Sequence, residues 1–328
     1  MAGVAQRRTR QRAQQRVEPH LTINTPDFVT ALAYFPDGRK LVTSTGDGAV
    51  TIWNTDNGKK EAILVLNDLD RLDAIVHLAV TQDGKTLICG ALRGKIKILD
   101  VGLNEIVKEW THPGSCQHFA ISLDDRLLAV GDSEVYIHGI EGWDVKQVIQ
   151  VHDLRCLSFP PAGDKLACAT GRKGDIRVYD VTTGTLLQDP FTGHKAAIYK
   201  LLWSRDGHRL FSVSYDRTIR SWNADTGEQI GHPWTGLNTG YVEALSLSPD
   251  GLILASVSSV RITTIRFWNA ATGALVGKPL RCESVASARF SPSGELAAFT
   301  TTEWKLFFWQ VPQFDTIDSS LVNAYQMY

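Results

Sequence analysis

The chain has 328 residues, of which 43% are hydrophobic and 21% are charged, so it has enough apolar side chains for a core and is not disordered throughout. Its formal net charge of −1 gives no overall attraction to nucleic acid. Five scattered cysteines without a CxxC pair argue against a disulfide framework and against a cysteine-rich zinc site.

Residues 1–16 form a basic segment with no acidic side chain. Its five arginines are Arg7, Arg8, Arg10, Arg12 and Arg16. A secretory signal requires an apolar stretch after its basic residues, and none follows here. No run in the chain approaches the roughly 18–20 apolar residues that span a bilayer. We expect a disordered arm on a soluble, cytoplasmic protein, with a nuclear location as the alternative. If the protein is nuclear, the arginines would act as its nuclear address; in either location they could make weak contact with a polyanion.

Seven related segments follow the arm, each with a tight turn and a later strand that ends near an aromatic residue. The clearest copies are FPDGRKLVTSTGDGAVTIWN, SRDGHRLFSVSYDRTIRSWN and SPDGLILASVSSVRITTIRFWN. The aligned end positions are Trp53, Leu99, His138, Tyr179, Trp222, Trp268 and Trp309, which are 39 to 46 residues apart. A repeat of this period indicates an array built from one supersecondary unit.

Each unit predicts four short strands. An apolar run such as VTALAYF or IYKLLWS precedes the first turn, and a β-rich run such as KLVTST or HRLFSVS follows it. A second turn leads to the strand with the aromatic residue, and a TG-type turn leads to a fourth, weaker strand. Turn residues between runs of β-formers are typical of antiparallel hairpins. Only six fourth strands can be found, so we expect residues 17–24 to supply the seventh.

This pattern resembles the WD40 repeat, although the Trp-Asp pair that gives the repeat its name is altered here. The resemblance implies an all-β, seven-bladed propeller over residues 17–312, with residues 1–16 as an arm and residues 313–328 as a C-terminal tail. It also implies that the N-terminal strand closes the ring on the last blade, which leaves no long unpaired edge.

The fifth repeat contains His, Ser and Asp, which raises the alternative of nucleophilic catalysis. The WD40 resemblance implies instead a structural hydrogen-bond network made by His194, Ser214, Asp216 and Trp222. A nucleophilic serine needs an oriented base and an oxyanion hole, and the chain lacks the GxSxG motif that would indicate them. We therefore predict no catalytic residue and no enzymatic activity.

His77 and His118 occupy the same position in neighbouring inner strands, and Lys200 occupies it in the fifth repeat. These side chains would line a central channel. A zinc site needs three or four ligands in range, whereas the column otherwise offers Ala31, Cys156, Ala244 and Ser287. We favour packing or solvation over a metal site. The chain has no P-loop, GxGxxG or HExxH motif, so no cofactor is predicted.

Propellers commonly bind partners with the loops before the inner strands and between the second and third strands. The aromatic and charged candidates in these loops are Phe28, Arg93, Arg172, Lys173, Lys195, Tyr215, Tyr241, Arg261 and Trp304. Aromatic residues and arginines are enriched at binding hot spots. We expect a non-enzymatic scaffold or adaptor that binds a protein or peptide. The alternatives are a sensor module related to the WD40 arrays of fungal multidomain proteins, or a propeller enzyme acting at the channel.

Overall fold

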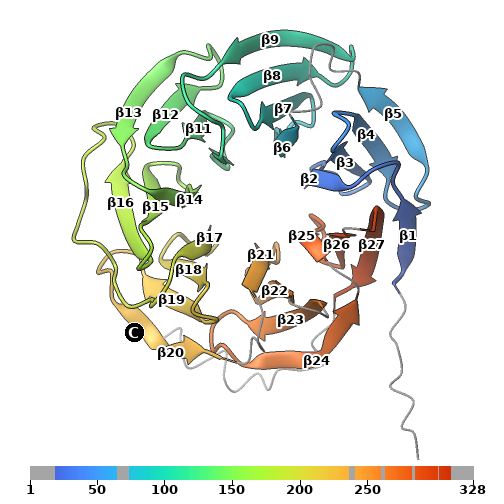
Figure 1. Cartoon of the computed structure of the whole chain (residues 1–328). Helices are drawn as coiled ribbons and strands as arrows, with labels where there is room; N and C mark the ends of the chain where they lie inside the picture. Colours follow the sequence, from blue (N-terminus) through green and yellow to red (C-terminus); the bar gives the residue numbers. More distant parts are fainter. Residues whose placement is uncertain are drawn as a thin grey trace, which may run out of the picture.

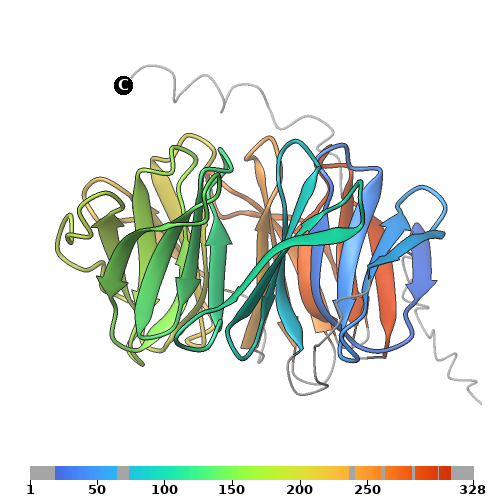
Figure 2. The same ribbon diagram turned by 90° about the horizontal axis from the view of Figure 1, so that it is seen from above.

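The protein is described by a computed structural model, which covers residues 19–64, 74–235, 241–259, 263–282, 285–301 and 303–311. In these ranges the regular structure is entirely β, and it forms seven antiparallel sheets arranged as blades around a central axis (Figure 1). Edge-on, the loops that join the strands gather at two opposite faces of the ring (Figure 2). No helix in the described ranges could cross a membrane.

The blades are numbered in chain order, from the innermost strand outward. Blade 1 contains β2 (Val29–Tyr34), β3 (Lys40–Thr45), β4 (Val50–Asn54) and β5 (Lys60–Leu64). Blade 2 contains β6 (Ile75–Val80), β7 (Thr86–Ala91), β8 (Lys95–Asp100) and β9 (Glu105–Thr111). Blade 3 contains β10 (His118–Ile121), β11 (Leu127–Gly131), β12 (Glu134–Gly139) and β13 (Val145–Gln150). Blade 4 contains β14 (Leu154–Ser158), β15 (Lys165–Thr170) and β16 (Asp175–Asp180).

Blade 5 contains β17 (Ile198–Trp203), β18 (Arg209–Ser214), β19 (Ile219–Asn223) and β20 (Gln229–Trp234). Blade 6 contains β21 (Tyr241–Leu247), β22 (Ile253–Ser259), β23 (Thr263–Asn269) and β24 (Leu275–Cys282). Blade 7 contains β25 (Val285–Phe290), β26 (Leu296–Thr301), β27 (Lys305–Gln310) and, as its outer strand, β1 (Leu21–Asn24).

The ring is closed by β1, which pairs antiparallel with β27 from Leu21 opposite Phe308 to Asn24 opposite Lys305. The predicted seven-bladed propeller with an N-terminal closing strand is therefore confirmed. The strand begins at Leu21, and Ile23 is buried against Leu306 and Phe308. This apolar contact supplements the ladder hydrogen bonds at the point where the two ends of the ring meet.

The outer edge of blade 4 differs from the expected fourth strand. Only two isolated bridges, Tyr179 to Leu186 and Ile176 to Phe191, join the segment after β16 to the blade. Phe191 is nonetheless buried, and its ring lies 6.1 Å from that of Trp222 in the next blade. This side chain therefore packs at the blade 4–blade 5 junction even though the segment makes no continuous ladder.

The core lies between neighbouring blades. One cluster joins Ala167, Ile176 and Val178 of blade 4 to Leu210 and Trp222 of blade 5. Both faces of the second strands are covered, so nearly every residue of strands such as β3, β15 and β18 is buried, including their Ser and Thr residues. The inter-blade packing fixes the loops at the two ends of the ring.

Candidate functional site

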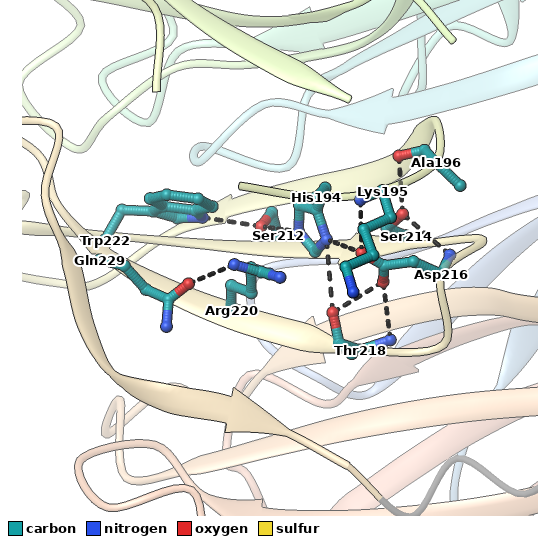
Figure 3. Close-up of polar contacts among 10 residues, drawn as sticks. All are labelled: His194, Lys195, Ala196, Ser212, Ser214, Asp216, Thr218, Arg220, Trp222 and Gln229. Atoms are coloured by element: carbon teal, nitrogen blue, oxygen red, sulfur yellow. Dashed lines mark hydrogen bonds and ion pairs between the residues drawn. The ribbon is translucent and has the colours of Figure 1, made fainter. Parts of the chain in front are cut away.

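Four side chains of blade 5 form a hydrogen-bonded chain that connects its interior to a loop at one face of the ring (Figure 3). Trp222 Nε1 donates to Ser212 Oγ at 2.7 Å, and Ser212 Oγ lies 2.7 Å from His194 Nε2. His194 Nδ1 lies 2.8 Å from Asp216 Oδ2. Because the carboxylate only accepts, His194 donates through Nδ1 and accepts the Ser212 proton at Nε2.

The serine in this chain differs from the one expected, since Ser212, and not Ser214, joins His194 to Trp222. In the β18–β19 ladder Trp222 lies opposite Leu210, which places its indole diagonally over Ser212. Ser214 is one step nearer the loop, where its hydroxyl donates to the Ala196 carbonyl at 2.8 Å.

The same diagonal relation occurs in two other blades, where Trp53 donates to Thr43 at 2.8 Å and Trp268 donates to Ser256 at 2.8 Å. In blade 7 the corresponding position is Phe299, and among the described residues Trp309 Nε1 has no hydrogen-bond partner. The indole N–H is therefore satisfied only where the diagonal residue has a hydroxyl.

The network holds a neutral histidine beside a charged aspartate. Burial lowers the pKa of His194, although the hydrogen bond and the charge of Asp216 act to raise it. Burial acts to raise the pKa of Asp216, but the hydrogen bonds from His194, Thr218 and the Lys195 amide outweigh it and hold that pKa well below its usual range. Thr218 Oγ1 donates to Asp216 Oδ1 at 2.7 Å.

Ser212, His194 and Asp216 thus have the connectivity of a catalytic triad without the access that catalysis needs. Ser212 is fully buried, and its oxygen already accepts the Trp222 N–H. A substrate carbonyl could not reach this hydroxyl while the blade is folded. The set serves to tie the interior of the blade to its loop.

The loop that the network anchors carries exposed side chains. The Lys195 amide donates to Asp216 Oδ2 at 2.9 Å, and the Tyr215 amide donates to the Ala197 carbonyl at 3.0 Å. Both side chains are exposed. We call the face with these loops the top face: it has the loops before the inner strands and the turns between second and third strands.

Five of the other predicted partner-binding residues also lie in top-face loops. Those with described, exposed side chains are Phe28, Arg93, Arg172, Lys173 and Trp304. The Phe28 ring lies over Gly46, where an added Cβ would be 2.2 Å from it, so the absence of a side chain there lets the ring lie against the backbone. The Tyr241 side chain and Arg261 lie outside the described residues.

A β-bulge that recurs in the inner strands adds to the top face two exposed residues that the repeat pattern does not predict. A register shift occurs near the start of the inner strand in every blade except blade 3, as between Ile198 and Lys200 in blade 5. The bulged residues include Arg155 and Tyr199, and both are exposed. The Tyr199 and Tyr215 rings are 5.7 Å apart.

Comparison with known proteins establishes the family. The family model described as "WD domain, G-beta repeat" matches residues 16–54, 143–180 and 184–223. These matches fall within a ring of seven antiparallel blades. The chain is a WD40-repeat β-propeller.

Similar WD40 proteins are larger and diverse. The mouse cilia- and flagella-associated protein 52 is 22% identical over 247 residues, which cover 74% of this chain and 38% of that protein. The rat apoptotic protease-activating factor 1 is 23% identical over 70% of this chain and 21% of its own length. Arabidopsis thaliana autophagy-related protein 16 is 25% identical over 58% of this chain and 37% of its own length. This chain therefore matches less than two fifths of each of these relatives.

A chain in a crystal structure of the mitotic checkpoint complex has the same fold, with a TM-score of 0.78. The two chains are 19% identical, and the match covers 90% of this chain and 95% of the other. The likeness extends over nearly the whole propeller, including the blades that the family model does not match.

The histidines in the channel of this WD40 propeller link neighbouring blades. His77 Nε2 donates to the Gln117 carbonyl at 3.1 Å, and its ring stacks on Phe119. His118 Nε2 donates to the Leu154 carbonyl at 3.2 Å. Burial lowers the pKa of His77 to about 4, and burial also lowers that of His118. Among the described residues no group of three or more His, Cys, Asp or Glu side chains could hold a metal ion.

Proposed function

We propose that the protein is a non-enzymatic scaffold that binds another protein through the top face of blades 4 and 5. The bound segment of the partner would be acidic and would contact the exposed tyrosine rings of this face. The observation that carries this proposal is the exposed Tyr199–Tyr215 pair, with cationic side chains beside it in the sequence and in the adjoining blade. Those cations are Arg172, Lys173, Lys195 and Arg217.

The chemistry of this patch suits a peptide partner. Tyrosine rings offer large contact areas at a small cost in side-chain entropy. The surrounding Lys and Arg side chains would steer an acidic segment toward the rings. The side chain of the nearby Asp216 is only 7% exposed and already accepts the hydrogen bonds of the network. Its negative charge therefore offsets little of the positive potential at the surface.

The rigidity of the loops also favours docking. The backbone of residues 195–197 is held by Asp216 Oδ2, by the Ser214 hydroxyl and by the Tyr215 amide. A preorganised surface loses less conformational entropy when a partner binds. The relatives support the same class of function, because the structural neighbour was crystallised in a complex.

The experiment is affinity purification with mass spectrometry. It compares the wild type with a triple variant in which Arg172, Lys195 and Tyr215 are changed to Ala. The matched control changes Leu103, Arg126 and Leu252, which are exposed on the opposite face, to Ala. We expect partners that the control retains to be lost by the top-face variant. Retention of every partner by the top-face variant would overturn the proposal.

We further propose that the protein is cytoplasmic and that Arg7, Arg8, Arg10, Arg12 and Arg16 supply at most a nuclear address or a weak polyanion contact. These residues lie outside the described ranges, and the support is their sequence alone. Changing all five to Ala tests the proposal by fluorescence localisation. Salt-dependent retention on a polyanion column tests the polyanion contact.

A further inference from the structure

The channel at the centre of the ring is a second candidate site, which adjoins the top-face tyrosine pair because Tyr199 also lines it. A cavity of about 680 Å³ is lined by residues of all seven blades, most of them on the inner strands, and Figure 1 shows these strands arranged around the central axis. This volume is in the range that holds small organic ligands. The walls are mixed in character, with backbone, small apolar side chains and a few charged groups.

The charges on the described part of this wall are unbalanced. The cationic side chains are Arg155, Lys200, Arg205 and Arg289, and the acidic one is Asp125. The excess is positive although the whole chain has a net charge of −1. Asp125 lies in a turn after β10, where its carboxylate accepts the Gln82 amide proton. Arg155 pairs with Asp153 at 2.6 Å, where both side chains are more than a third exposed.

Lys200 and Arg289 have no acidic partner inside the channel among the residues that the structure describes. Among the described residues neither forms a salt bridge, and the one hydrogen bond of the pair is from Arg289 Nη1 to the Ala288 carbonyl at 3.0 Å. Burial, together with the positive charge of Arg289, lowers the pKa of Lys200 to about 8. Both side chains are half-buried, and two like charges on the wall of one channel repel each other unless an anion compensates for them.

Lys200 lines the channel together with His77, His118 and Arg289. Its charge lowers the pKa of His77 in blade 2 and of His118 in blade 3, and the charge of Arg289 in blade 7 lowers the pKa of Lys200 itself. One side chain of blade 5 can affect blades on both sides of the ring only if it extends toward the centre. Because His77 and His118 use Nε2 to hold backbone carbonyls, Lys200 and Arg289 are the groups free to meet a ligand.

We propose that this channel binds a small phosphorylated molecule, with its phosphate group between Lys200 and Arg289. The fork of an arginine matches phosphate oxygens, and lysine adds a point charge that needs no fixed direction. The phosphate would neutralise the two cations, and the remaining volume would hold the rest of the molecule. Such a ligand would tie blades 5 and 7 together from the inside and stabilise the ring.

The test is calorimetric titration of the full chain with pyrophosphate and with inorganic phosphate, and sodium chloride at equal ionic strength is the control for screening. We expect saturable binding of pyrophosphate that falls at least tenfold in Lys200→Met and in Arg289→Met. Lys108→Met, at an exposed position on outer strand β9 and away from both candidate sites, is the matched control and is expected to bind like the wild type. Lys200→Arg, which keeps the charge, is expected to remain within about threefold of the wild type.

Thermal unfolding without ligand gives an independent readout. Removing one of the two cations relieves their mutual repulsion and is expected to leave the melting temperature unchanged or raise it, while pyrophosphate should raise it only in proteins with both cations. If Lys200→Met does not fold, Arg289→Met and Lys200→Arg decide the question. No binding of pyrophosphate by the wild type at millimolar concentration, or an equal loss of pyrophosphate affinity in Lys108→Met, would overturn the proposal.

Discussion

At the residue scale, the position of one hydroxyl decides whether a buried indole is satisfied. Ser212 and Ser214 lie two residues apart on β18 and point to the same face, so their spacing to Asp216 and Trp222 could not distinguish them in the sequence. The strand register distinguishes them, because Trp222 lies opposite Leu210 and reaches diagonally to Ser212. The sequence thus predicted a network in blade 5, but the choice of serine required the pairing of two strands.

This difference predicts unequal effects of two similar substitutions. Ser212→Ala should destabilise the fold by about 1–3 kcal/mol, because it leaves Trp222 Nε1 and His194 Nε2 buried without partners. Ser214→Ala should cost about 1 kcal/mol or less, because its partners lie at the edge of the loop. Urea unfolding of both variants measures the difference. A larger loss of unfolding free energy in Ser214→Ala than in Ser212→Ala would show that Ser214, and not Ser212, belongs to the network.

At the element scale, the repeats predicted the blades, but not the departures from regular pairing. Runs of β-formers and turn residues were enough to place the three inner strands of each unit and most of the outer strands, and the count of outer strands together with the WD40 resemblance placed the closing strand. The bulges that expose Arg155 and Tyr199 leave no mark in composition, because a bulge inserts an ordinary residue. The sequence also did not predict that blade 4 lacks a continuous outer strand. The segment after β16 contains β-formers, and residues such as Phe191 are buried against the blade without forming a ladder.

Contacts between neighbouring blades can be tested at one turn of blade 4. Gly171 and Gly174 both have positive φ, of 71° and 78°. An added Cβ at Gly174 would lie 2.3 Å from the Ala196 carbonyl oxygen in blade 5, whereas one at Gly171 would meet nothing within 4 Å. Gly171→Ala should therefore cost only the backbone strain of about 1–2 kcal/mol.

Gly174→Ala should cost more than that, because the turn must also move away from the loop that carries His194 and Lys195. Thermal unfolding of the two variants is the measurement, with Gly171→Ala as the control for conformational strain. Equal losses in the two variants would mean that the contact between these blades is loose.

At the scale of the whole molecule, buried neutral histidines link stability to pH. Burial lowers the pKa of five of them, which are His77, His112, His118, His138 and His194. In the unfolded chain these groups bind protons near their ordinary pKa of about 6.5. The unfolded state therefore takes up more protons as the pH falls from about 6.5 toward 4, and the free energy of unfolding decreases over that window.

We expect the melting temperature to fall by at least about 5 °C between pH 7 and 5. His77→Gln, which keeps a donor for the Gln117 carbonyl, should reduce the slope because that site no longer titrates. Scanning calorimetry at several pH values measures both. A melting temperature that rises on acidification would contradict the burial of neutral histidines.

The central claim is that the top face of blades 4 and 5 binds a protein partner, and photo-crosslinking in cells tests it most directly. A photoreactive p-benzoylphenylalanine replaces Tyr215 on the top face or Leu103, 67% exposed, on the opposite face. We predict a discrete crosslinked product from position 215 that is absent from position 103 and disappears when Arg172 and Lys195 are changed to Ala. Crosslinks from position 103 with none from position 215 would contradict this account.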